Sequence, residues 1–407
     1  MSEVVVIGGG QAGLAVSHEL SRTGVEHVVL EKGRVGQTWR GMWDSFCLVT
    51  PNWTLQLPGH HYAGADPDGF LARDAIVGYL EDYAASFRPP LREGVEVTSL
   101  ERGASSRFLL RTTIGDLEAD RVVLATGAYQ RPHRPAGADA FPSNLLVLDA
   151  ERYSNPRALP PGPVLIVGAG QTGCQLAEEA RESGRDVFLA GGRAPWLPRR
   201  IGGKDVVQWM VDTGFMEAPP SSLPSPAARL LSNPQASGHG RGHDLNYRTL
   251  RAAGVQLLGH LTRVASGRAQ FAPDLAQSVA FGDQRFADFC KLVEQFCVAR
   301  GVPTPAFEVP EPFVADAPDS IPLAGLGAVI LTSGFRPDYS RWVRFPAFDE
   351  MGFPIQEDGA SQTVPGLYFV GVHFLRKRKS SLLLGVGEDA TVVARAVAAG
   401  SALITRS

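Results

Sequence analysis

Two stretches decide the fold: residues 4–13, which read VVVIGGGQAG, and residues 164–173, which read VLIVGAGQTG. Each is a short apolar run followed by Gly-x-Gly-x-x-Gly and then by apolar residues at helical spacing. In that context the first glycine permits a tight turn, the second permits close approach of a diphosphate, and the third permits helix–strand packing. The N-terminus of the helix attracts the phosphate charge. The two stretches therefore predict two nucleotide-binding units that begin 160 residues apart.

Other apolar runs that end at glycine predict further strands of the same kind, at residues 121–127, 328–334 and 367–371. Continuous apolar runs suit strands that are buried on both faces of a parallel sheet. We therefore expect an α/β fold with two Rossmann-like dinucleotide-binding domains, the first of which is interrupted by the second. The expected ranges are 1–157 and 325–407 for the two parts of the first domain and 158–324 for the second domain.

Composition excludes several classes of protein. Lys+Arg 39 against Asp+Glu 42 leaves a net charge of −3, so the chain has no broad basic field for nucleic acid. Its four cysteines are too scattered for a disulfide framework. No apolar run approaches the roughly 18–20 residues of a membrane span, and no signal-peptide pattern is visible at the start. We expect a cytoplasmic protein that binds neither membranes nor nucleic acid, with homo-oligomerisation left open.

The residues that follow the two units differ in charge. Glu31 lies 18 residues after Gly13 at the end of an apolar run, where a carboxylate can accept hydrogen bonds from an adenosine ribose. The corresponding place in the second unit has no acid and is followed by Arg193, with Arg199 and Arg200 close behind. Because an arginine there can pair with a 2′-phosphate, we expect NADPH in preference to NADH. The alternative is a solvated arginine face.

Four segments resemble a known family. Two dinucleotide folds in one chain resemble the FAD/NAD(P)H two-domain flavoproteins. More narrowly, residues 36–40 (GQTWR) are similar to the glycine-x-x-Trp-Arg segment of the flavin-containing monooxygenase and Baeyer–Villiger (class B) group. Residues 125–127 (ATG) match the chain crossing of that superfamily. Residues 367–371 and 385–390 are similar to its C-terminal return to the flavin.

The resemblance implies FAD in the first domain, NADPH in the second, and a set of cofactor-contacting residues. On the FAD side these are Gly8, Gly10, Gln11, Ala12, Gly13, Glu31, Lys32, Gln37, Trp39, Arg40, Thr126, Gly127, Gly371 and Gly387. On the NADPH side they are Gly168, Gly170, Gln171, Thr172, Gly173 and Arg193. No spacing of ligands for a metal site is present, and none is expected.

The same resemblance implies a single-component monooxygenase that inserts one atom of O2 into a small molecule at nitrogen, sulfur or a ketone. Residues 141–153 depart from the group, because Asp149 stands where the group has a histidine. Two alternatives stay open: an NADPH:acceptor reductase or oxidase, and a non-catalytic FAD-binding sensor or partner protein. Dithiol–disulfide exchange lacks its reactive pair because the chain contains no Cys-x-x-Cys.

Catalytic residues are not fixed by any motif, and the candidates are His373, His243 and Asp149. His243 lies in residues 239–246, beside a long loop expected at 217–241; the alternative for 239–246 is a surface turn that caps a helix starting at Tyr247. The basic run 376–379 either attracts an acidic substrate or the NADPH phosphates, or is a solvated charge run.

Trp39, Trp43, Phe46 and Trp53 favour core packing over flavin stacking. Cys290 and Cys297 are predicted to lie on one face of a buried helix.

Overall fold

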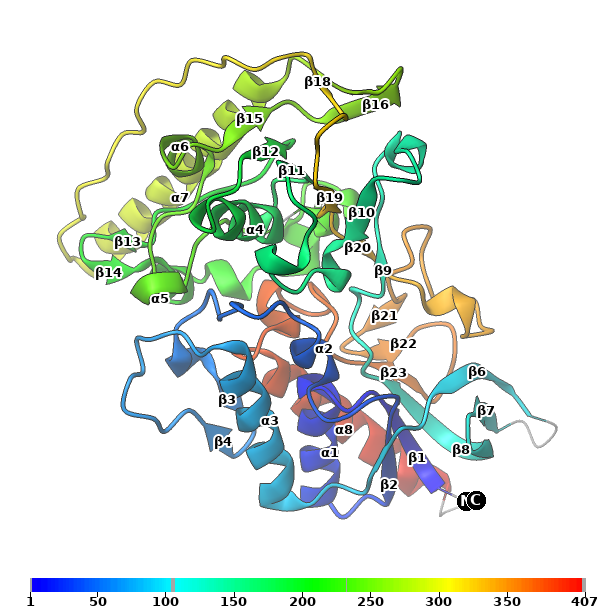
Figure 1. Ribbon diagram of the computed structural model, residues 1–407. Helices are drawn as coiled ribbons and strands as arrows, with labels where there is room; N and C mark the ends of the chain where they lie inside the picture. Colours follow the sequence, from blue (N-terminus) through cyan, green and yellow to red (C-terminus); the bar gives the residue numbers. More distant parts are fainter. Residues whose placement is uncertain (1, 104–106, 232, 405–407) are drawn as a thin grey trace.

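The computed structural model describes residues 2–103, 107–231 and 233–404, which form two α/β units stacked one above the other (Figure 1). The lower unit is built on a nine-stranded sheet. Its main path is β21 (Gln356–Glu357), β22 (Ala360–Ser361), β23 (Leu367–Phe369), β8 (Gly115–Leu124), β1 (Ser2–Ile7), β2 (His27–Glu31) and β5 (Leu91–Glu93), with β6 (Val97–Arg102) and β7 (Phe108–Thr112) joined through β8.

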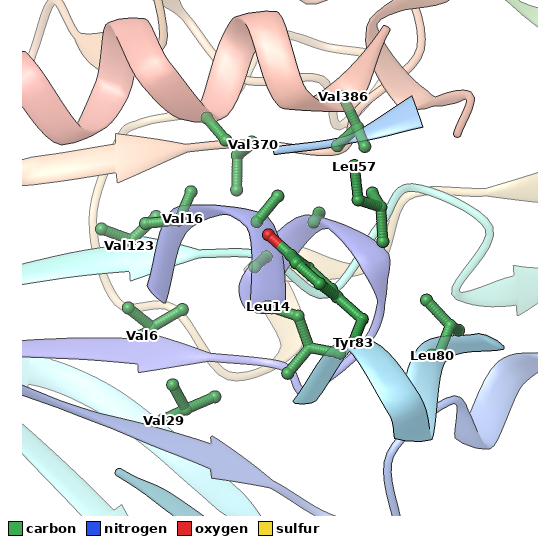
Figure 2. Close-up of a cluster of buried hydrophobic side chains, with 14 of the residues drawn as sticks. Val6, Leu14, Val16, Val29, Leu57, Leu80, Tyr83, Val123, Val370 and Val386 are labelled. Carbon is green, nitrogen blue, oxygen red and sulfur yellow. The ribbon is translucent and has the colours of Figure 1, made fainter. Parts of the chain in front are cut away.

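Four helices pack against the lower sheet near its central strand β1. They are α1 (Gln11–Arg22), α2 (Gln37–Arg40), α3 (Arg73–Phe87) and α8 (Val386–Ile404). Figure 2 shows Leu14 and Val16 of α1 beside Val6 and Val123 of the sheet, in a cluster of buried side chains. The helical spacing of apolar residues after the first glycine turn thus becomes the contact between α1 and the sheet.

The upper unit is built on a five-stranded sheet in which every pairing is parallel. Its order is β10 (Leu146–Asp149), β19 (Ala328–Leu331), β11 (Val164–Val167), β12 (Val187–Ala190) and β15 (Gln256–Leu258). The helices of this unit are α4 (Gln171–Glu182), α5 (Val206–Asp212), α6 (Tyr247–Ala252) and α7 (Leu275–Arg300). The predicted α/β architecture is confirmed: the upper sheet is parallel throughout, and the lower sheet has a parallel centre, β23-β8-β1-β2-β5, with antiparallel strands joined at β8 and β23.

Small sheets and bridges complete the units. They are β3 (Gln56–Leu57) with β4 (His60–His61), β13 (Arg200–Ile201) with β14 (Lys204–Asp205), and β16 (Leu261–Ala265) with β17 (Arg268–Phe271) and β18 (Ser320–Pro322). After β18 the chain returns to the upper sheet as β19. The long stretch between α7 and β18 runs as an extended strap along the outside of the upper unit (Figure 1).

The chain passes between the two units twice, and the two passages pair with each other. β9 (Arg131–Pro132) and β20 (Phe335–Arg336) form an antiparallel ribbon, and the amide of His133 donates to the carbonyl oxygen of Gly334 at 2.8 Å. The five-stranded sheet uses only residues between these passages. It includes β10 and β19, which both lie outside the range 158–324 expected for the second domain.

Two local expectations concern helices. The surface-turn alternative for residues 239–246 is what the structure has, because the side chain of Asn246 caps α6 by accepting from the amides of Arg248 and Thr249. Cys290 and Cys297 lie on one helix, α7, and Cys297 is fully buried whereas Cys290 is partly exposed. Among the described residues no helix has the length and apolarity to cross a bilayer.

Candidate functional site

The carboxyl ends of the central strands of the lower sheet are level with one another. Ile7 of β1 pairs with both Leu30 of β2 and Leu124 of β8, and Phe369 of β23 also pairs with Leu124. Residues that follow these strands therefore meet at one edge of the sheet, which is where ligands bind in open parallel α/β folds. The expected FAD-contacting residues Gly8, Glu31, Thr126, Gly127 and Gly371 are brought together at this edge.

In the first glycine turn, two glycines have no room for a side chain and one has open space beside it. Gly8 has φ +111°, and a Cβ there would lie 2.7 Å from the carbonyl oxygen of Ala125. A Cβ on Gly13 would overlap the carbonyl oxygen of Gly8. At Gly10, by contrast, a Cβ would meet nothing within 4 Å. Gly10 also precedes α1 without any side-chain cap, and no acid lies in the first turn. The turn leaves room and unpaired donors for an anion.

Glu31 lies beside this turn. It is buried, and its two carboxylate oxygens accept from the amides of Gly9 at 2.6 Å and Gly33 at 2.7 Å. These bonds fix the carboxylate next to the glycine turn. A carboxylate has further lone pairs beyond these two bonds, so it can still accept from ribose hydroxyls.

The polar residues of α1 and α2 link the turn to the C-terminal segment. Gln11 Nε2 donates to the carbonyl oxygen of Ser381 at 2.7 Å, and Gln11 Oε1 accepts from the indole nitrogen of Trp39 at 3.0 Å. Ala12 lies against Gly371, where a Cβ could not be accommodated. Gly387, in the first turn of α8, lies against Pro58.

Three other expected FAD residues have different surroundings. Arg40 is paired with Glu81 and also donates to the carbonyl oxygen of Val35. Gln37 and Lys32 have exposed side chains. At the chain crossing, Thr126 Oγ1 accepts from Gln130 Nε2 at 3.0 Å, and the hydroxyl of Tyr339 donates to Gly127 at 2.6 Å.

The second glycine turn repeats this geometry at the carboxyl edge of the upper sheet. Gly168 has φ +115° and lies against the backbone of Thr332, and a Cβ on Gly173 would overlap the carbonyl oxygen of Gly168. Gly170 precedes α4 without a side-chain cap, and no acid lies in the first turn. Thr172 in that turn is partly exposed.

The end of the 217–241 loop is packed onto this second turn, which sequence reasoning missed. Gln171 Nε2 donates to the carbonyl oxygen of Ala236 at 2.7 Å, and the amide of Ala236 donates back to Gln171 Oε1 at 3.0 Å. The buried side chain of Gln235 donates to Ala169 within the turn. In the sequence, only the dipeptide Gln235-Ala236 could indicate this packing. Such a dipeptide is too common to be recognised as a signal.

The three arginines proposed for the 2′-phosphate have different environments. Arg193 lies three residues after the end of β12, is exposed, and makes no ion pair within the described part of the chain. Arg199 is fully buried, pairs with Asp205 and donates to the carbonyl oxygen of Val49 at 2.8 Å. Arg200 is exposed and bonds the backbone of residues 241 and 242. Arg199 is therefore unavailable to a nucleotide, whereas Arg193 is free to meet one.

The three catalytic candidates are held by separate partners. Asp149, at the end of β10, is paired with Arg134 through both carboxylate oxygens, at 3.1 and 2.8 Å. His243 Nε2 lies 2.7 Å from a carboxylate oxygen of Glu178, and this hydrogen bond raises the histidine pKa. No contact joins either of them to His373 within the described residues.

His373 belongs to an aromatic stack. Its ring is stacked on Tyr129, with centroids 5.2 Å apart and planes at 11°, and meets Phe353 edge-on at 5.1 Å. Its Nε2 donates to the carbonyl oxygen of Arg229 at 2.9 Å. Burial lowers the pKa of His373 to about 4, so the ring is neutral at pH 7. It can offer Nδ1 as an acceptor there.

Three of the four cations of the basic run 376–379 are paired with carboxylates. Arg376 pairs with Asp358 and Asp389. Lys377 and Lys379 both contact the same two carboxylates, Glu217 at the end of the 3-10 turn Phe215–Glu217 and Glu388 in the first turn of α8. The run therefore ties the upper unit to α8. Arg378 has no such partner.

The crowded aromatic residues of the N-terminal segment pack against one another. Phe46 contacts both Trp39, at 5.8 Å between centroids, and the buried Trp43, at 4.9 Å. Trp53 packs against a separate cluster around α5 and α7. Trp43 and Phe46 therefore pack in the core.

All four cysteines are free. Burial raises the pKa of the Cys47 and Cys290 thiols to about 11 and also raises that of Cys174. These thiols are protonated at pH 7 and do not act as thiolate nucleophiles. No group of acidic, histidine or cysteine side chains among the described residues could hold a metal ion.

Comparison with known proteins agrees with this geometry. The pyridine nucleotide-disulphide oxidoreductase family profile matches residues 5–211. A CzcO-like oxidoreductase of Geobacillus kaustophilus is 32% identical over 95% of this chain and 96% of its own. Indole-3-pyruvate monooxygenase YUCCA4 of Oryza sativa is 28% identical over 48% of this chain and 49% of its own. A flavin-containing monooxygenase of Stenotrophomonas maltophilia has the same fold, with TM-score 0.68, 20% identity, and coverage of 98% and 100%.

Proposed function

Because this chain belongs to the pyridine nucleotide-disulphide oxidoreductase family, we propose that it is an FAD-dependent, NADPH-consuming oxidoreductase. More specifically, we propose a single-component monooxygenase that transfers one atom of O2 to a small molecule. One observation carries the proposal. Two uncapped helix N-termini follow glycine turns at the carboxyl ends of parallel strands, one in each sheet, with Glu31 beside the first and Arg193 near the second.

The residues of the lower unit fit FAD. Gly10 leaves open the space that a diphosphate would fill, and the free amides at the start of α1 would receive its charge. Glu31 would accept from the adenosine ribose while keeping its bonds to Gly9 and Gly33. The Gln11–Trp39 pair and the carbonyl oxygen of Ser381 would hold the turn against the segment that precedes α8.

In the upper unit, α4 and Arg193 would hold NADPH. The unpaired amides at the start of α4 would receive the diphosphate, and Arg193 would pair with the 2′-phosphate. Bound FAD would supply the redox chemistry, accepting a hydride from the nicotinamide and reacting with oxygen. The protein would bind and orient the cofactors and the substrate, and it would exclude water from the site. The absence of any catalytic-triad spacing in the sequence agrees with that limited role.

Two observations favour oxygen transfer over thiol chemistry. YUCCA4 and the Stenotrophomonas protein are named as monooxygenases. In this chain the raised thiol pKa values of Cys47, Cys174 and Cys290 argue against a redox-active cysteine pair. The substrate would be a small molecule oxidised at nitrogen, sulfur or a ketone.

Anaerobic stopped-flow spectroscopy tests the proposal. Holoprotein is mixed first with NADPH and then with oxygenated buffer while the flavin absorbance is followed. Rapid bleaching by NADPH, followed by a lasting spectral band that belongs to neither oxidised nor reduced flavin, supports a monooxygenase. Immediate reoxidation with stoichiometric H2O2 indicates a reductase or oxidase instead. Absence of bleaching indicates a protein that binds FAD without turnover, and equal rates with NADH contradict the NADPH assignment.

A further inference from the structure

Arg378 is the exception in the basic run 376–379. The other three cations of the run are each paired with carboxylates. The side chain of Arg378 makes no hydrogen bond and no ion pair within the described residues, although its backbone amide is held by the carbonyl oxygen of Ala218 at 2.9 Å. A positive charge that is half-buried without a counter-ion costs free energy, so an anion supplied from outside would stabilise it.

Two aromatic rings hold the guanidinium of Arg378. Its Cζ lies 4.1 Å from the ring centroid of Phe215 and 4.8 Å from that of Phe374. Phe215 comes from the turn after α5 in the upper unit, whereas Phe374 comes from the segment between β23 and α8 in the lower unit. Two rings in contact with a guanidinium restrict its orientation. The N–H donors at the edge of the guanidinium then determine which ligand can bind.

That edge is accessible only at its tip. Nε of Arg378 is buried and has no partner, whereas the residue as a whole is partly exposed. The terminal Nη groups are not among the fully buried unpartnered atoms, so they reach solvent. Burial lowers the pKa of Arg378 to about 10, which still leaves it charged at pH 7. A small ligand can therefore meet the two Nη groups while the remainder of the side chain is enclosed.

One of the two rings stands in a strained conformation. Phe374 has φ +53°, a left-handed value that a bulky residue adopts only when its surroundings impose it. Phe374 is buried, and the neighbouring segment is fixed by the Ser380 hydroxyl, which accepts from the amides of Arg376 and Lys377. The local backbone is thus held so that Phe374 lies under Arg378.

We propose that Arg378 binds a carboxylate group of the substrate. A guanidinium presents parallel N–H donors that match a planar carboxylate. One unpaired positive charge also matches a monoanion, whereas a phosphate dianion would need further cations, and Lys377 and Lys379 are already neutralised. Phe215 and Leu382 both pack against the apolar cluster around α5 and α7. They would provide a non-polar surface for the body of the substrate.

The inference rests on the proposed function, because residues 372–385 lead directly to α8, where the family resemblance puts the flavin. It narrows the substrate from any small molecule to one that carries a carboxylate. The test therefore measures equilibrium binding to oxidised holoprotein, which requires no turnover. Failure to retain FAD would refute the proposed function, whereas an FAD-loaded protein that ignores carboxylates would refute this inference alone.

Isothermal titration calorimetry of holoprotein with benzoate, benzamide, phenyl phosphate and NADP+ tests the site. Benzoate should bind at least tenfold more tightly than benzamide, its uncharged isostere. Arg378→Met keeps the length and the apolar stem, and it should weaken benzoate binding about 10- to 100-fold while leaving benzamide unchanged. Arg378→Lys should recover only part of the loss, because an ammonium lacks the planar fork.

Arg300→Met is the matched control. Arg300 likewise lies over an aromatic ring, that of Phe296 at 5.6 Å, but it is exposed at the end of α7. Its replacement should leave all four ligands unaffected. Equal affinity of wild type and Arg378→Met for benzoate overturns the proposal, provided that thermal unfolding shows both proteins folded. A loss confined to phenyl phosphate or NADP+ also overturns it, because the site would then serve a cofactor phosphate.

Discussion

Replacing Gly10 by alanine should weaken FAD binding without destabilising the apoprotein. Gly10 has φ −81° and ψ −171°, which alanine adopts freely, and a Cβ there meets nothing within 4 Å. A Gly→Ala replacement at a compatible position gains about 0.4–1 kcal/mol from the unfolded chain. Alanine is a poorer N-cap than glycine by a similar amount, so the two effects nearly cancel.

The methyl group would nevertheless occupy the space left for the diphosphate. Displacing the phosphate from one amide of α1 removes a charge-assisted hydrogen bond, worth about 1.5–3 kcal/mol. The dissociation constant for FAD should therefore rise about 10- to 150-fold. Quenching of flavin fluorescence during titration of apoprotein with FAD measures this, and urea unfolding of the apoprotein measures stability.

Two further variants bracket the effect. Gly78→Ala lies inside α3, where a Cβ also meets nothing, so it should stabilise the protein by up to about 1 kcal/mol and leave FAD affinity unchanged. Gly13→Ala would force a Cβ into the carbonyl oxygen of Gly8 and should destabilise the apoprotein itself by about 3 kcal/mol or more. Unchanged FAD affinity in Gly10→Ala would refute the placement of the diphosphate over Gly10.

Three other outcomes follow from the contacts described. Arg193→Ala should raise KM for NADPH about tenfold and leave KM for NADH unchanged; equal changes would remove Arg193 from the 2′-phosphate site. Stability should fall as pH drops from 6.5 towards 4, by about 2–3 kcal/mol, because unfolded His373 binds a proton that the folded ring with its lowered pKa refuses. His373→Gln should flatten that part of the urea-midpoint profile, and an unaltered profile would contradict the burial argument. Glu217→Gln should cost about 1–2 kcal/mol, because Lys377 and Lys379 lose a shared carboxylate, and the cost should shrink in 1 M salt.

The parts of the fold that depend on neighbouring residues could be predicted from the sequence. The strand–turn–helix pattern at residues 4–13 gives β1 and α1 because a single local geometry satisfies the glycines and the apolar spacing. The Asn246 cap of α6 is likewise a local device. The spacing of Cys290 and Cys297 predicts a helix around them, but its extent from Leu275 to Arg300 is seen only in the structure.

The chemistry of the site was less accessible, because it depends on contacts between distant segments. Arg199 and Arg200 are neighbours with the same charge, yet only Arg199 is buried against Asp205. The run 376–379 looks uniform in the sequence, but Arg376 pairs with one set of carboxylates, Lys377 and Lys379 share another, and Arg378 pairs with none among the described residues. Arg378 lies against Phe374 and against Phe215, which is more than 160 residues away, whereas the other three cations meet carboxylates. Pattern alone carries no record of such pairings.

The paired passages between the units have a consequence for how the chain is assembled. Since the amide of His133 bonds the carbonyl oxygen of Gly334, the whole upper unit leaves and re-enters the lower one at a single point. The number of residues in the upper unit therefore adds little to the loss of chain entropy when the strands of the lower sheet come together. A lower unit in which a tight turn joins residue 133 to residue 334 would have the same edge-to-edge geometry. The strand pairing around the first glycine turn therefore depends little on the length of the upper unit.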